Sequence, residues 1–291
     1  MLFNILIAGI LLGSIYALVT IGYSMVYGIL KLMNFAHGDV YIFGTLFCFT
    51  LLSKYHLNAV IAVVISAIMG GVLASAVEFF AYRRLRAAQH RMISMITALG
   101  AAYIIQNCSE LEWGSQVLPF PSLIPAQFIE VFGHQISTTQ IITLMVAVGF
   151  IVLFNLFLKY HKMGKAILCV SEDINTSRLM GIPINLIISI VYFLGGVLGV
   201  IGGILYSASF NAISLGMGFR GTIIAFTAAV IGGIGSMNGA LIGGMILGIS
   251  ENIIAVYVSS TYRDTLTFLI LIIVLLIKPS GIMGKGDYEK V

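Results

Sequence analysis

The stretch LFNILIAGILLGSIYALVTIGYSMVYGIL, residues 2–30, decides the fold class of this chain. The first 30 residues contain no Asp, Glu, Lys or Arg. About 20 apolar residues are enough for a helix to cross the hydrocarbon core, and a helix satisfies its own backbone there. No basic segment precedes this stretch, which favours a retained membrane span over a removed signal peptide.

The rest of the chain has the same character. It is 59% hydrophobic, only 9% charged and contains 32 Gly, against roughly 25% charged residues in ordinary soluble domains. We therefore expect an all-α integral membrane protein with one transmembrane domain over residues 1–291. The net charge of +4 comes from basic loops, so no nucleic-acid partner is indicated. The three cysteines show no metal-binding or disulfide spacing.

The gaps between charged residues predict eight or nine membrane crossings. The candidate spans are Leu2–Leu30, Val40–Ser53, His56–Tyr82, Met92–Ser109, Gln135–Leu158, Ile184–Ser209, Gly221–Gly235, Ala240–Tyr257 and Thr265–Ile277. Residues 83–91, residues 159–178 and the tail after residue 277 hold 11 of the 15 Lys and Arg. The positive-inside rule makes these three regions cytoplasmic, the loop 110–134 external and the N-terminus external.

Two regions predict discontinuous helices. The span from Val40 to Ser53 is short, and glycines interrupt VIGGIGSMNGALIGGMILG, residues 230–248. Broken segments of this kind often surround a pathway near the middle of the membrane. Glycines four residues apart, as in 195–203 and 235–243, more often allow two helices to pack closely.

The sequence contains no recognisable motif for nucleotide binding, metal binding or catalysis. Neither Gly-Lys pair is followed by Ser or Thr, so no ATP-binding phosphate loop is encoded. The five histidines are scattered, and no metal site or catalytic cluster is expected. Glu78 and Glu251 lie within spans; we expect an ion pair at a helix end for Glu78 with Arg83, and solvation near the outer surface for Glu251.

The cytoplasmic segment Lys162–Pro183 contains an amphipathic pattern. Met163, Ile167, Val170 and Ile174 form one apolar stripe, and Gly181 with Pro183 predicts the helix end. The stripe could lie on lipid or in a groove of a partner protein. The acidic Glu172 and Asp173, which anionic lipid would repel, favour a protein partner.

Four segments together resemble the LivH-type permeases of branched-chain amino acid ABC importers. They are GSIYALVTIGYSMVYGILKLMNFAHGDVYIFG (residues 13–44), GKAILCVSEDINTSRLMGI (164–182), FTAAVIGGIGSMNGALIGGMILGISE (226–251) and SSTYRDTLTFLILIIVLLIKPSGIMG (259–284). The resemblance spans nearly the whole chain in order. It implies the ABC importer permease fold, a bacterial inner-membrane location and no enzymatic activity in this chain.

The resemblance also implies partners. These are a homologous second permease, two cytoplasmic ATPases that bind ATP and Mg, and an extracytoplasmic substrate-binding protein. It matches residues 164–182 to the coupling helix that docks into an ATPase, with Leu168 where the family usually carries Arg. The residues expected to couple to the ATPase are Lys165, Ile167, Val170, Glu172, Asp173 and Ile174. Urea and short-amide permeases share the N-x-A-H-G segment, so they remain an alternative.

The expected mechanism is alternating access driven by ATP binding to the partner ATPases. A zwitterion would need polar contacts at the helix breaks. The candidate lining residues are Asn34, Phe35, His37, Gly38, Asn211 and Asn238. His37 could gate transport, cap the following helix or face water, and Asp39 could be the helix N-cap. A stand-alone secondary carrier, which would need neither a docking helix nor ATP, is the alternative from another class.

Overall fold

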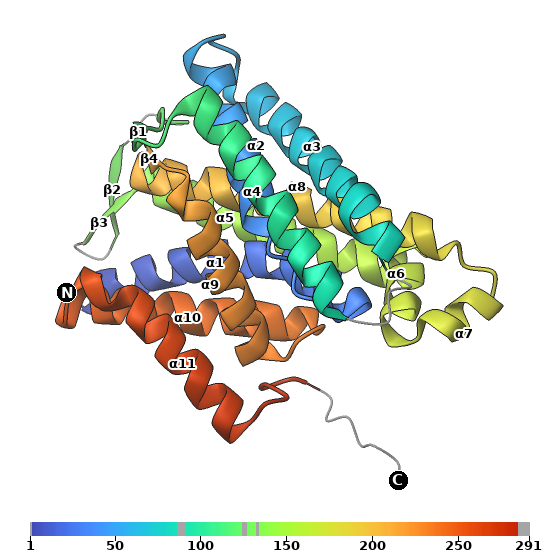
Figure 1. Ribbon diagram of the computed structural model, residues 1–291. Coiled ribbons are helices and arrows are strands. Elements are labelled where there is room, and N and C mark those ends of the chain that lie inside the picture. Colours follow the sequence, from blue (N-terminus) through green and yellow to red (C-terminus); the bar gives the residue numbers. More distant parts are fainter. Residues whose placement is uncertain (1, 86–90, 124–126, 132–133, 285–291) are drawn as a thin grey trace.

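The computed structural model describes residues 2–85, 91–123, 127–131 and 134–284, and in this part the chain is a bundle of helices (Figure 1). The α-helices are α1 (Leu2–Leu30), α2 (His37–Ser53), α3 (Ala59–Val77), α4 (Arg91–Trp113), α5 (Thr138–Tyr160), α6 (Lys162–Glu172), α7 (Ile174–Leu179), α8 (Ile184–Phe210), α9 (Gly216–Gly232), α10 (Met237–Tyr257) and α11 (Arg263–Ile277).

Seven helical segments of this part are long and apolar enough to cross a membrane. The helices α2 and α9 have 17 residues each and are shorter. Counting them gives nine helices in the membrane part, in agreement with the expected eight or nine. The all-α fold is confirmed; the short strands β1 (Leu118–Pro119), β2 (Phe128–Val131), β3 (His134–Ser137) and β4 (Ala212–Ile213) lie in connecting segments.

The centre of the bundle is formed by α1 and α8, which are buried along most of their length. Glycine makes the close contacts between helices possible. A Cβ atom on Gly22 of α1 would lie 2.8 Å from the carbonyl oxygen of Gly195 on α8. Gly195 belongs to the glycine series expected to pack helices, and the structure confirms this use.

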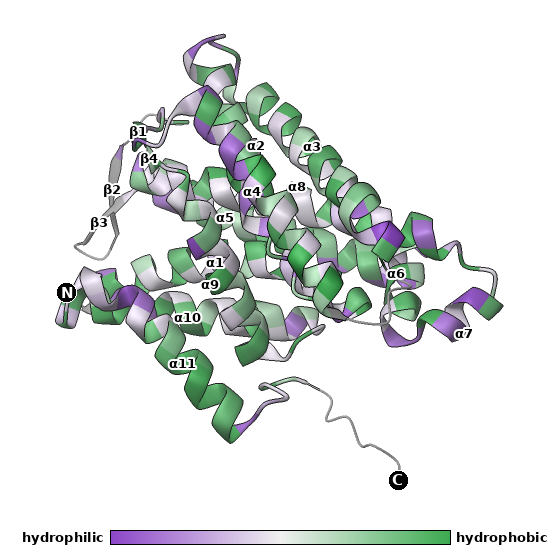
Figure 2. Ribbon diagram, viewed as in Figure 1, coloured by the Kyte–Doolittle hydropathy of each residue, from purple (hydrophilic) through white to green (hydrophobic). Residues whose placement is uncertain are grey.

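The connecting segments gather on two opposite faces. On one face, Ile282 and Met283 of the tail donate backbone hydrogen bonds to the carbonyls of Ile231 and Gly232, beside the turn 233–236. The helices α6 and α7 also lie here, and α6 contacts α1, α5 and α8. On the other face, β1 pairs with β4. Figure 2 shows hydrophobic residues along the spans and hydrophilic residues at their ends and on α7.

Several expected boundaries differ by a few residues, and two of the differences illustrate the reasons. The span expected from Gly221 begins at Gly216, because Arg220 lies inside α9 and pairs with Asp264 instead of ending the helix. The span expected from Gln135 begins at Thr138, because residues 134–137 form β3.

Candidate functional site

The short helix α2 begins inside the bundle. The segment 31–36 turns back from the end of α1, and the ring of His37 packs against Tyr23 with centroids 5.7 Å apart. Tyr23 lies seven residues before the end of α1, which corresponds to about 10 Å at 1.5 Å per residue. The expected discontinuous helix at KLMNFAHGDVY (31–41) is therefore present.

The first turns of α2 and α9 lie side by side. The N–H of Gly38 donates to Thr222 Oγ1 at 2.9 Å, and the Tyr41 hydroxyl donates to the carbonyl of Met217. The approach requires glycine, since a Cβ on Gly38 would clash with the Gly218 carbonyl oxygen. Two helix N-termini, each carrying partial positive charge, thus meet within the bundle.

A cavity of about 350 Å³, open to the surface of the chain, adjoins this meeting point. We call it the junction cavity. Its lining comes from the start of α2, from α4 and from α9: Phe35, Asp39, Leu99, Ala102, Tyr103, Gln106 and Phe219. Its volume is in the range of small-molecule sites, which is about 300–1,000 Å³.

Asp39 does not have the expected N-cap role. The N-cap position is Ala36, and Asp39 lies in the first turn of α2. Its side chain is 7% exposed and lines the junction cavity. The difference arises because α2 begins at His37, three residues before the expected start at Val40, so the carboxylate is already inside the helix.

The expected lining residues separate into three groups. Phe35 lines the junction cavity. Asn34, His37 and Gly38 are buried in the protein: Asn34 Oδ1 accepts from the Tyr82 hydroxyl at 3.2 Å. His37 lies between the rings of Tyr23 and Tyr41 and does not face water.

The other two asparagines lie far from this group. Asn211 is the exposed, left-handed C-cap of α8 next to β4. Asn238 is exposed in the first turn of α10 on the opposite face. The expected second break is present as the turn 233–236 between α9 and α10, and Asn238 lies directly after it. Asn211 lies instead at the end of α8, which continues unbroken to Phe210. Neither residue lines the junction cavity.

A second and much smaller cavity, of about 40 Å³, lies between α1, α2, α8 and α9. Among its lining residues are Tyr16, Tyr41, Tyr206, Ser207 and Arg220. Tyr41 lines this cavity, and its ring centroid lies 6.5 Å from that of His37. No local sequence pattern indicates this cavity, because its lining residues lie on four helices that are far apart in the chain.

Arg220 belongs to a buried polar cluster with Glu251. The Glu251 carboxylate accepts hydrogen bonds from the Tyr16 hydroxyl at 2.8 Å and the Thr267 hydroxyl at 2.7 Å. Arg220 Nη2 lies 3.8 Å from Glu251 Oε2, and Arg220 Nε donates a hydrogen bond to Asp264 Oδ1 at 2.7 Å. The expectation of a solvated Glu251 is wrong, because α1, α9 and α11 cover it completely.

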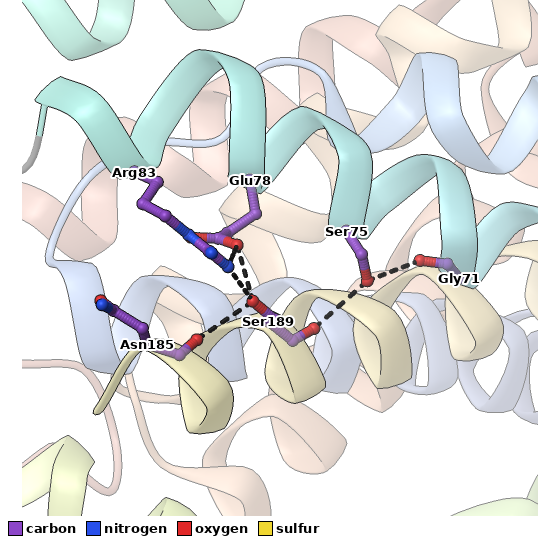
Figure 3. A network of polar contacts seen from close by, with 6 residues as sticks. All are labelled: Gly71, Ser75, Glu78, Arg83, Asn185 and Ser189. Atoms are coloured by element: carbon purple, nitrogen blue, oxygen red, sulfur yellow. Dashed lines mark hydrogen bonds and ion pairs between the residues drawn. The ribbon is translucent and has the colours of Figure 1, made fainter. Parts of the chain in front are cut away.

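Glu78 forms the expected ion pair, but within the protein (Figure 3). It begins a π-helical segment, Glu78–Tyr82, which continues α3; such segments are often found at functional sites. The buried carboxylate lies 2.8 Å from Arg83 Nη2 and accepts a hydrogen bond from Ser189 of α8 at 2.7 Å. The pair therefore links the C-terminal end of α3 to α8.

The apolar stripe of α6 is covered by the chain itself. Ile167 and Val170 are buried, and Met163 and Ile174 pack against the same core, which includes residues of α1, α5 and α8. The expectation that lipid or a partner's groove receives the stripe is wrong. The exposed side of α6 and of the break after it carries Lys165, Leu168, Glu172 and Asp173.

The expected single cytoplasmic helix is two helices, α6 and α7, which meet at Asp173. The Asp173 carboxylate accepts hydrogen bonds from the backbone N–H groups of Asn175 and Thr176 and is the N-cap of α7. These bonds, the one from Thr176 foremost, lower the pKa of Asp173 below its usual value.

The sequence matches the profile of the family described as the permease component of the branched-chain amino acid transport system, over residues 5–275. The chain belongs to this family. It is a multi-pass permease of the bacterial inner membrane, which confirms the resemblance drawn from its sequence.

The similarity to known permeases extends over nearly the whole length of this chain and of each relative. The high-affinity branched-chain amino acid transport system permease protein LivH of Escherichia coli (strain K12) is 39% identical, over 97% of this chain and 96% of the relative. BraD of Pseudomonas aeruginosa is 37% identical, over 98% and 97%. A probable LivH of Methanocaldococcus jannaschii is 28% identical, over 98% and 93%.

The fold of this permease resembles a solved structure of PsaBC from Streptococcus pneumoniae in complex with Fab. The TM-score is 0.54 at 16% sequence identity, covering 96% of this chain and 92% of the PsaBC chain. This likeness concerns the fold alone.

Proposed function

We propose that this permease is one membrane subunit of an ABC importer for branched-chain amino acids. The observation that carries the proposal is the meeting of two short helices, α2 and α9, beside a cavity with a largely apolar lining and one carboxylate. A hydrophobic amino acid needs such a wall for its side chain and a few polar groups for its charged ends. The relatives LivH and BraD, named for high-affinity branched-chain amino acid transport, support the same substrate class over urea.

The energy for transport comes from partners in this proposal. Two cytoplasmic ATPases bind ATP and Mg and hydrolyse the ATP, a homologous second permease completes the pathway, and an extracytoplasmic binding protein delivers the substrate. The chain itself contributes no cofactor. Closure of the ATPases shifts the equilibrium between outward-open and inward-open arrangements.

The exposed side of α6 and α7 is the proposed contact with the ATPase. Lys165, Glu172 and Asp173 are exposed there and can form contacts with a partner. Ile167 and Val170 are buried on the opposite side of α6, in the core where α6 packs against α1, α5 and α8. A displacement of α6 by the ATPase is therefore passed directly to the helices at the centre of the bundle.

Transport by the purified complex tests the proposal. The tagged permease is expressed with the proposed partner subunits, purified, and reconstituted into vesicles with ATP enclosed and the binding protein outside. We expect the ATPases to co-purify and labelled leucine to enter only with ATP, with competition by isoleucine and valine. Competition by urea alone would contradict the amino acid assignment. Uptake without ATP, by a permease that retains no ATPase, would indicate a secondary carrier.

A further inference from the structure

We propose that Asp39 binds the α-ammonium group of the substrate in the junction cavity. The inference rests on the proposed function and adds the recognition site within the permease. Three observations carry it: an unpaired carboxylate, the chemistry of the surrounding wall, and the side of the bundle on which the cavity opens.

Asp39 differs from the other two buried acidic residues of the described spans. Glu78 is paired with Arg83, and Glu251 lies beside Arg220. No cationic side chain of the described residues forms an ion pair with Asp39, although it is 7% exposed and lies beside Gly218 of α9. An ionisable group at membrane depth is costly and usually serves function. A buried carboxylate with no ion-pair partner among the described residues is suited to receive a cation from outside them.

The wall of the junction cavity suits the ammonium end of a hydrophobic amino acid. Phe35, Tyr103 and Phe219 place aromatic rings around the same space as Asp39. Aromatic faces attract cations, and the attraction is stronger where water is excluded. A carboxylate surrounded by aromatic rings is thus a site for a small organic cation.

The remaining lining residues suit the rest of the substrate. Gln106 of α4 contributes a side-chain amide, which can donate hydrogen bonds to the substrate carboxylate. Leu99 and Ala102 provide an aliphatic surface for the substrate side chain. Neither phosphate nor a sugar would require this combination of one acid, one amide and an apolar wall.

The cavity opens sideways from the bundle. Tyr103 and Phe219 at its edge are 63% and 62% exposed, so the space continues to the outer surface of α4 and α9. Lipid at this surface would bring hydrocarbon to a carboxylate, which is unfavourable. The second permease of the proposed importer would cover this side and enclose the substrate between the two subunits.

The test uses the complete importer in vesicles, with binding protein loaded with labelled leucine. The variants are Asp39→Asn, which removes the charge with little change in size, and Asp39→Glu, which keeps it. The matched control is Glu112→Gln, which removes an exposed carboxylate from the outer end of α4. Leucine uptake, ATP hydrolysis stimulated by the loaded binding protein, and elution of the complex in size-exclusion chromatography are measured for each.

We expect Asp39→Asn to reduce uptake about 10- to 100-fold, the effect of losing one hydrogen bond to a charged group. Stimulated ATP hydrolysis and complex elution should remain as in the wild type. Asp39→Glu should retain more uptake than Asp39→Asn, and Glu112→Gln should transport normally.

Three results would overturn the inference. One is uptake by Asp39→Asn equal to that of Glu112→Gln. Another is dissociation of the Asp39→Asn complex, which would assign the carboxylate to a cation of the second permease. The third is equal loss of uptake and stimulated ATP hydrolysis in both Asp39 variants, which would indicate a structural role. Failure of the wild type to import leucine would instead contradict the proposed function itself.

Discussion

Removing Arg83 should destabilise the permease strongly, while removing Arg84 beside it should not. Glu78 is completely buried, and its carboxylate has Arg83 Nη2 at 2.8 Å, Arg83 Nε at 3.3 Å and the Ser189 hydroxyl at 2.7 Å. Arg83→Ala takes away the charge that compensates this carboxylate. Breaking a buried ion pair from one side costs about 3–5 kcal/mol.

The size of the effect in a melting experiment follows from this range. A change of 1 kcal/mol shifts the midpoint of unfolding by about 2–4 °C for chains of 150–250 residues, so Arg83→Ala should lower the midpoint by roughly 10 °C. The assay heats the detergent-solubilised permease and measures the fraction that still elutes as a single species in size-exclusion chromatography. Arg84→Ala, which removes the same charge from an exposed side chain, is the matched control and should change the free energy of unfolding by no more than about 0.5 kcal/mol.

A double variant separates the ion pair from the loss of either side chain. Glu78→Leu with Arg83→Leu replaces the pair by apolar groups, a change that is often neutral or stabilising in other proteins. We expect the double variant to be more stable than Glu78→Leu alone or Arg83→Leu alone. Equal midpoints for Arg83→Ala and Arg84→Ala, or a double variant whose loss is the sum of the two single losses, would refute the reasoning.

Three further predictions concern the start of α2 and the helices α6 and α7. Gly38→Ala places a Cβ against the backbone of α9 and should destabilise the permease by about 1–3 kcal/mol, measured by the same thermal assay. Ile167→Ala should cost about 2–5 kcal/mol because the side chain is buried, whereas Leu168→Ala, on the exposed side of α6, should change stability little. Asp173→Ala should increase hydrogen exchange of the first amides of α7. Because capping holds the pKa of Asp173 low, wild-type protection of those amides should persist below the usual carboxyl range and disappear as the pH falls through the lowered pKa.

Hydropathy and charge located the spans and their ends well. Both are local properties: a run of about 20 apolar residues identifies a span wherever it packs, and basic loops identify one face. The same local reasoning found the break before α2, because Asn34, His37 and Asp39 interrupt an apolar sequence. It misplaced the start of α9, because Arg220 is a charge that the helix keeps.

The contents of the junction cavity were only partly predictable. Phe35 was expected and lines it, while Asn34 and His37 are turned into the protein. Polarity near a break indicates where a pathway can exist, but the rotation of each helix decides which side chains face it. That rotation is set by packing, such as the glycine contact between Gly38 and α9.

The apolar stripe of α6 was likewise only partly predictable from the sequence. The spacing of its apolar residues correctly indicated a buried face, but periodicity does not tell which molecule covers that face. In the folded chain, residues of α1, α5 and α8 cover it.

The sequence by itself determined the membrane class, the approximate positions of the apolar helices, the break before α2 and the family, because each depends on residues that are close together in the chain or on their order along it. Only the tertiary structure decided that Tyr16 and Glu251, 235 residues apart, share a hydrogen bond, that Asn211 and Asn238 lie at opposite faces, and that Asp39 faces a cavity without an ion-pair partner in its described surroundings. These facts depend on how helices distant in sequence rotate and pack against one another, and no local pattern records that.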